Sequence, residues 1–185
     1  MTPIDTRPIE VPPADEGTLP APRPVPGGAS GGATGGAQEK AFDGTTASSE
    51  RLRPGMKPAT LKEVRAAENE GFDRVVVEFA GAGVSGWRAR YLEGSARQCG
   101  SGDAVKVAGS ALLEVTLLPA QAHDEKGQVT IKDRERKPGL PLIQEMKLTC
   151  DFEGQVTWVL GLSEKAPYRV LELGSPARVV VDVRR

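Results

Sequence analysis

Apolar and polar residues alternate in the last third of the chain, in three runs separated by short loops of Ser, Glu, Lys, Gly and Pro: residues 155–162, 168–173 and 177–183. In the last run three valines share one face of a pleat, whereas Arg178 and Asp182 fall on the other. A period of two is typical of a half-buried antiparallel strand. The pattern therefore predicts an all-β domain.

The same alternation continues upstream and predicts further strands at residues 60–66, 72–79, 87–92, 105–107, 111–118 and 142–152, with at most a short strand at 129–131. No stretch between them has helical periodicity of useful length. Eight or nine short strands in roughly 127 residues, with turn residues between them, favour a sandwich or a barrel. A two-sheet antiparallel β-sandwich suits a domain of this length best.

One pattern occurs twice, about a hundred residues apart: FDRVVVEF and PARVVVDV share the order Arg-Val-Val-Val-acid-apolar. Each copy would bury three apolar residues and place an arginine and an acid on the opposite face. These are Arg74 and Glu78 in the first copy, and Arg178 and Asp182 in the second. Either the two strands are structurally equivalent, or half-buried strands simply have few ways to be written.

Residues 1–58 have the composition of a low-complexity tail, Pro-rich at first and then rich in Gly, Ala and Ser. Such a sequence buries too little apolar surface to offset the entropy of ordering, so we expect a disordered tail followed by a folded domain at residues 59–185. As a flexible coil, ~58 residues span roughly 40 Å. The tail is then either a tether between an anchor and the domain or a dispensable extension.

Charge and hydropathy limit the classes of partner that the protein can bind. The 24 basic and 25 acidic residues give a formal net charge of −1, without the basic block that phosphate-backbone binding requires. We therefore expect no nucleic-acid partner. No run approaches the roughly 18–20 apolar residues that cross a bilayer, so we expect membrane contact only through an N-terminal anchor that has been removed. A cytosolic chain would show the same pattern. We expect a monomer.

The two cysteines are Cys99, in a polar loop, and Cys150, in a predicted strand. A disulfide between them would close a loop worth about 4 kcal/mol in the chain-entropy model, and would persist only in an oxidising compartment. We favour this pairing. The alternative is that Cys150 is a small core residue and Cys99 an idle thiol.

The single histidine, His123, has no second histidine or cysteine cluster with which to complete a zinc site. No nucleophile, phosphate-binding or dinucleotide motif is visible, so we expect no metal, no cofactor and no catalytic residue. We interpret His123 as structural, hydrogen-bonded in the loop after residues 111–118. The alternative is a small hydrolase that uses His123 and Asp124 for acid–base chemistry.

Aromatic side chains could form glycan-stacking platforms. Trp158 alternates with apolar residues and is expected in the core, and so are Trp87 and Tyr91. Tyr168, between Pro167 and Arg169, is the more plausible exposed aromatic ring.

Five segments together resemble one known family, the AMIN-like domain: GFDRVVVEF (71–79), WRARYLE (87–93), VAGSALLEVTLLPAQAHDEKGQVT (107–130), CDFEGQVTWVLGLSEKAPYRVLEL (150–173) and PARVVVDV (176–183). That family occurs in bacterial lipoproteins and exported proteins. It is named for its similarity to the AMIN domain, the non-catalytic module of periplasmic cell-wall amidases and of some secretin pores. The resemblance covers about residues 61–183. Its most specific parts are HDE-x-G, DFEG-x-V-T-W-V-x-GL and R-V-V-V-D-V.

The resemblance implies a β-sandwich located in the periplasm or at the cell surface of a bacterium, with no enzymatic activity. Its partner would be peptidoglycan or another cell-wall glycan, or else an envelope protein in an assembly that touches no glycan. The closing motif of the family corresponds to Arg178 and Asp182 in this chain. With their counterparts Arg74 and Glu78 they would supply charged contacts, and Tyr168 would stack on a sugar ring.

Overall fold

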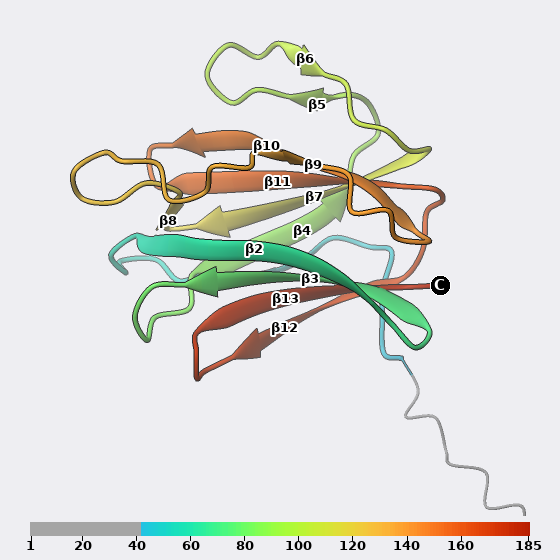
Figure 1. Ribbon diagram of the computed structural model, residues 1–185, viewed down its shortest axis with the longest axis horizontal. Helices are drawn as coiled ribbons and strands as arrows, with labels where there is room; N and C mark the ends of the chain where they lie inside the picture. Colours follow the sequence, from blue (N-terminus) through green and yellow to red (C-terminus); the bar gives the residue numbers. More distant parts are fainter. Residues whose placement is uncertain (1–41) are drawn as a thin grey trace, which may run out of the picture. The chain divides into compact units, whose positions relative to one another are not determined.

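The computed structural model describes residues 42–185; the rest of the predicted tail, residues 1–41, lies outside the described residues. Thirteen strands form two facing sheets and a small hairpin (Figure 1). The strands are β1 (Ser49–Arg51), β2 (Ala59–Asn69), β3 (Phe72–Phe79), β4 (Gly86–Tyr91), β5 (Ala96–Arg97), β6 (Ala104–Val105), β7 (Ala111–Leu118), β8 (Ala120–Gln121), β9 (Glu135–Arg136), β10 (Ile143–Phe152), β11 (Gln155–Leu162), β12 (Tyr168–Leu173) and β13 (Arg178–Arg184).

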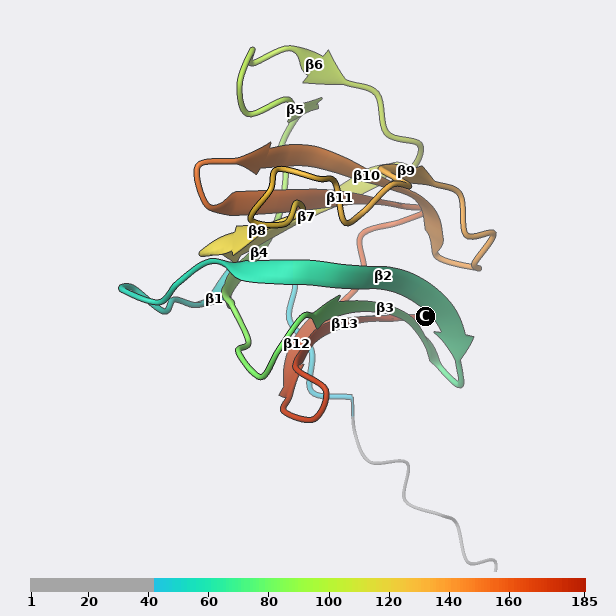
Figure 2. The same ribbon diagram turned by 60° about the vertical axis from the view of Figure 1, so that its left-hand side comes forward.

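The predicted two-sheet sandwich is confirmed. One sheet has six strands in the order β1-β4-β7-β11-β10-β9, and the other has five in the order β12-β13-β3-β2-β8. Figure 2 shows the two sheets as stacked layers, with the β5–β6 hairpin above the six-stranded layer. Eight strands have six or more residues, in agreement with the eight or nine expected, and the others have only two or three.

The core fills the space between the sheets, and it is mostly aliphatic. Alternate residues of β3 and β13 point inward, so that the valines at 75, 77, 179, 181 and 183 are buried there. Trp158 on β11 is the largest fully buried side chain, as its alternation with apolar residues predicted. Each sheet is thus half-buried, which explains the period-two pattern of the sequence.

The boundary between tail and domain differs from the one that composition predicted. Residues 49–51 form β1, which pairs with β4 from Ser49↔Ala89 to Arg51↔Trp87. Upstream of it, Thr45 and Tyr168 exchange two backbone hydrogen bonds of 2.8 and 2.9 Å. Residues 42–58 therefore belong to the fold. Composition missed them because this segment pairs through its backbone and offers few apolar side chains.

The predicted disulfide between Cys99 and Cys150 is confirmed, with 5.2 Å between the two Cα atoms. A register shift between Leu148 and Cys150 in β10 turns Cys150 to the outer face, opposite Thr157. The bond therefore joins the segment carrying β5 and β6 to the outside of the six-stranded sheet (Figure 1). Among residues 42–185 there is no helix long and apolar enough to cross a membrane.

The disulfide should stabilise the domain mainly by restricting the unfolded chain. Its sequence separation is 51 residues, for which the loop-entropy relation gives about 4 kcal/mol. We expect the double variant Cys99→Ala/Cys150→Ala to lose about this much free energy of unfolding, measured by urea titration without reductant. Reductant should lower the free energy of unfolding of the wild type to that of the variant, and should leave the variant's value unchanged. Equal stability of the two oxidised proteins would contradict this account.

Candidate binding face on the five-stranded sheet

The two copies of the Arg-Val-Val-Val-acid pattern are neighbours in the five-stranded sheet. Strands β3 and β13 pair antiparallel, with Asp182 opposite Arg74 and Arg178 opposite Glu78. Antiparallel pairing of one pattern with its own repeat places the arginine of each copy opposite the acid of the other. The repeated sequence pattern thus forms two neighbouring strands with complementary charges. All four predicted residues lie on the outer face of this sheet.

Asp182 is fully buried beneath that face. Arg74 binds its carboxylate with two nitrogens, at 2.6 and 2.9 Å, and Arg169 adds a third hydrogen bond of 2.9 Å. Two phenylalanine rings cover the arginines: the Arg169 guanidinium lies 4.5 Å from the centre of Phe42, and that of Arg74 lies 5.1 Å from the centre of Phe72.

This burial corrects one expectation from the sequence, because Asp182 cannot touch a ligand directly. It holds Arg74 and Arg169 in place instead. The hydrogen bonds to Asp182 raise the pKa of Arg74 further above its usual value. Sequence reasoning missed Arg169, Phe42 and Phe72, since none of them belongs to the repeated pattern.

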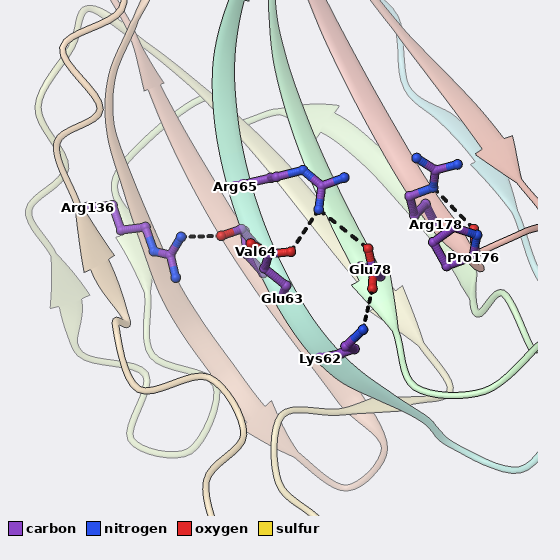
Figure 3. A network of polar contacts seen from close by, with 8 residues as sticks. All are labelled: Lys62, Glu63, Val64, Arg65, Glu78, Arg136, Pro176 and Arg178. Carbon is purple, nitrogen blue, oxygen red and sulfur yellow. Dashed lines mark hydrogen bonds and ion pairs between the residues drawn. The ribbon is translucent and has the colours of Figure 1, made fainter.

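Glu78 is also largely covered, with 8% of its surface exposed. Lys62 donates a hydrogen bond of 2.8 Å to one carboxylate oxygen, and Arg65 approaches the other at 3.5 Å (Figure 3). The hydrogen bond from Lys62 keeps the pKa of Glu78 below its ordinary value. Glu78 is therefore an anchor for neighbouring cations on β2.

Arg178 is the predicted site residue that stays available. Its Nε donates to the carbonyl oxygen of Pro176 at 3.1 Å. Within residues 42–185, neither terminal nitrogen has a hydrogen-bond partner and no carboxylate forms an ion pair with it. Glu78, its neighbour in register, turns toward β2 (Figure 3). The guanidinium is thus held at one nitrogen and open at its fork.

Tyr168 contradicts the expectation of an exposed, stacking ring, because it is fully buried. Its hydroxyl lies 2.7 Å from the carbonyl oxygens of Ala47 and Ala89, and Ser49 Oγ lies 3.1 Å away. Burial raises the pKa of this hydroxyl. The ring therefore fastens the N-terminal segment to both sheets.

The face of β12 that points outward carries leucines instead. Leu171 and Leu173 are 36% and 38% exposed, and Leu173 lies opposite Arg178 in the β12–β13 register. Two apolar side chains and an open guanidinium thus stand together at the edge of the outer face.

Glu172 points inward from the same strand and joins the two sheets. Its carboxylate accepts hydrogen bonds from Arg53 at 2.7 and 3.0 Å, from Arg51 at 3.2 Å and from Trp87 Nε1 at 2.8 Å. The hydrogen bonds from Arg53 are the main reason why the pKa of Glu172 is lowered. Trp87 is buried, as expected, and Tyr91 packs partly buried against the core.

His123 has the structural role that the sequence suggested. Its Nδ1 lies 3.1 Å from Asp151 Oδ1, which also accepts a hydrogen bond from the backbone of Ala122, while Arg134 binds Oδ2 at 2.9 Å. Asp151 thereby connects the HDE-x-G and DFEG segments.

The alternative of a His123–Asp124 catalytic pair finds no support in this geometry. The side chain of Asp124 accepts hydrogen bonds from the backbone of Lys126 and Gln128 and closes its own turn. Among the described residues, no group of three or more His, Cys, Asp or Glu side chains is placed to hold a metal ion.

The model of the AMIN-like domain family matches residues 59–185, which is more than half of the chain. The chain belongs to the AMIN-like domain family. Comparisons with curated proteins and with solved structures found no match. AMIN-like domains are generally non-catalytic modules of binding or localisation, associated with the cell wall outside the cytoplasm. The Cys99–Cys150 disulfide is typical of the same compartment.

Removal of the Arg74 side chain tests how much the ion pair with the buried Asp182 carboxylate stabilises the fold. We expect Arg74→Ala to lower the free energy of unfolding by about 3 kcal/mol, because it leaves Asp182 buried with one cation. Arg88→Ala is the control, since Arg88 pairs with Glu50 at an exposed position and should cost at most about 1 kcal/mol. Equal losses in urea titrations would contradict the role of Asp182.

The lowered pKa of Glu172 predicts how the stability of the fold changes at acidic pH. A carboxylate whose pKa is lower in the folded than in the unfolded state stabilises the fold above its ordinary value of 4.5, and this stability is lost as the pH falls through the folded pKa. Between about pH 6 and about pH 3 the free energy of unfolding should therefore fall less in Glu172→Gln than in the wild type. The exposed Glu50→Gln serves as the control. Parallel pH profiles for wild type and Glu172→Gln would refute the assignment.

Proposed function

We propose that this AMIN-like domain is an extracytoplasmic, non-catalytic module that binds the carboxylate groups of peptidoglycan through the outer face of its five-stranded sheet. The observation that carries the proposal is the open fork of Arg178. A guanidinium with both terminal nitrogens free can receive a carboxylate through two parallel hydrogen bonds. Cell-wall glycan with peptide stems offers such groups on an extended, sugar-rich chain.

The surroundings of Arg178 support the same reading. Arg74 and Arg169 share the single charge of Asp182, so one positive charge on this part of the face stays unbalanced. Leu171 and Leu173 offer apolar contact beside it. Asp182 and Glu78 act from beneath, by fixing the cations around them, and do not touch the ligand.

In this proposal the domain holds the protein at the cell wall and catalyses no reaction. Residues 1–41, with their proline-rich and glycine-rich composition, would serve as a tether to an anchor in the envelope. The proposed periplasmic or cell-surface location is supported by the disulfide and by the family.

The test is co-sedimentation with purified peptidoglycan sacculi. Arg178→Ala should weaken binding at least about tenfold. Arg178→Lys keeps the charge but loses the fork, so it should recover only part of that loss. Arg88→Ala removes an arginine from the outer face of the other sheet and should bind like the wild type. If Arg178→Ala also binds like the wild type, the proposed site is wrong.

A further inference from the structure

Strand β12 is an unprotected edge of the five-stranded sheet. It pairs with β13 on one side only, and on its other side Thr45 forms a bridge to Tyr168. Backbone groups alternate between the two sides of a strand, so Val170 and Glu172 face the same way as Tyr168. Among residues 42–185, no backbone hydrogen bond reaches Val170 or Glu172 from that side.

The other three outermost strands are short. Strand β1 has three residues, and β8 and β9 have two each, whereas β12 has six. Short strands, prolines, lysines and bulges are the usual ways in which proteins blunt an edge. The sequence of β12, YRVLEL, contains no proline, lysine or bulge, and its inward-pointing charge, Glu172, is paired with Arg51 and Arg53. It also exposes Leu171 and Leu173.

The Thr45 bridge shows that this edge accepts an extended chain. Thr45 and Tyr168 exchange both backbone hydrogen bonds, in antiparallel orientation. The chain then leaves the edge, because Phe42 packs on Phe72 at the outer face, with 6.1 Å between the ring centres. The row of edge groups therefore continues at Val170 and Glu172 without a described partner.

The charges around the edge are predominantly positive. Five arginines surround β12: Arg51 and Arg53 at Glu172, Arg74 and Arg169 at Asp182, and Arg178 opposite Leu173. Among residues 42–185, the ion pairs of these five arginines involve two carboxylates, those of Glu172 and Asp182. A strand added here would therefore be favoured by acidic side chains.

We propose that β12 binds an extended, proline-free, acidic segment of a partner protein, which adds a sixth strand to the five-stranded sheet. The backbone groups of Val170 and Glu172 would supply the main-chain hydrogen bonds, and Leu171 and the surrounding arginines would select apolar and acidic side chains. This contact goes beyond the proposed glycan contact of Arg178. The two share Arg178 and Leu171, but the glycan contact depends on the fork of Arg178 and the strand contact on the backbone groups of Val170 and Glu172, so Arg178→Ala and Val170→Pro separate them.

Two other occupants fit the edge less well. The chain's own residues 1–26 contain a proline every few positions, and proline cannot donate to a ladder. A second copy of the domain would bring the same five arginines against these five.

The experiment is amide hydrogen exchange by NMR on the full chain, with the acetylated and amidated peptide Glu-Val-Glu-Val-Glu-Val-Glu as the probe. At saturation, exchange at the Val170 and Glu172 amides should slow at least about tenfold. The same peptide with lysine in place of glutamate should leave both rates unchanged.

Two variants locate the contact. Val170→Pro removes an N–H that points to the free edge and removes no hydrogen bond between β12 and β13, so it should abolish peptide binding while β13 amides keep their protection. Arg51→Glu should weaken binding at least about tenfold, and the matched reversal Arg88→Glu, which also breaks one surface ion pair, should change it less than about twofold. Sacculus binding by Val170→Pro should stay at the wild-type level.

Three outcomes would overturn the proposal. The first is that neither peptide protects the two amides. In the second, both amides are already protected in the free chain at every concentration, so that the chain's own N-terminal segment occupies the edge. In the third, protection rises with protein concentration alone, which would identify a second copy as the occupant.

Discussion

The buried carboxylate of Asp182 sets the form of the outer face of the five-stranded sheet. A charge without contact to water must be matched by partners that are themselves held in place. Arg74 and Arg169 supply them, and Phe42 and Phe72 cover the guanidinium groups. The repeated sequence pattern thus provides the charge pair, while the cover comes from a residue before the first strand and from the start of β3.

The same constraint explains which site residues the sequence could predict. Alternation correctly placed Arg74, Glu78, Arg178 and Asp182 on one face, because the period of two is a property of the backbone. It could not say how deep each of them lies. Depth depends on neighbouring strands and on long side chains that fold over the sheet, and here these bury the two acids and leave Arg178 open.

Strand β12 shows why the sequence misplaced Tyr168. Tyr168, Val170 and Glu172 share one face of the strand. The tyrosine and valine favour the core, whereas the glutamate favours solvent, so the sequence alone does not decide which way this face points. In the structure the glutamate is drawn inward by Arg53 and Trp87, and Tyr168 follows it. The partner Arg53 lies in a segment that composition had assigned to the tail, and so does Ser49, which contacts the tyrosine hydroxyl. The boundary error and the error at Tyr168 therefore have one origin.

The outer faces of the two sheets are covered in different ways. On the six-stranded sheet, the disulfide holds the β5–β6 segment against β10, and the chain near Ala108 passes so close to β11 that a Cβ at Gly161 would lie 1.7 Å from the Ala108 carbonyl oxygen. Only glycine fits at such an approach. That face is thus partly closed by the chain itself. On the outer face of the five-stranded sheet the cover includes long side chains and the Phe42 ring, and Val76, Val180 and Asp182 are buried there. The two outer faces therefore differ in how they are covered, and under the function proposed above the arginine-bearing face is the one that would meet the partner.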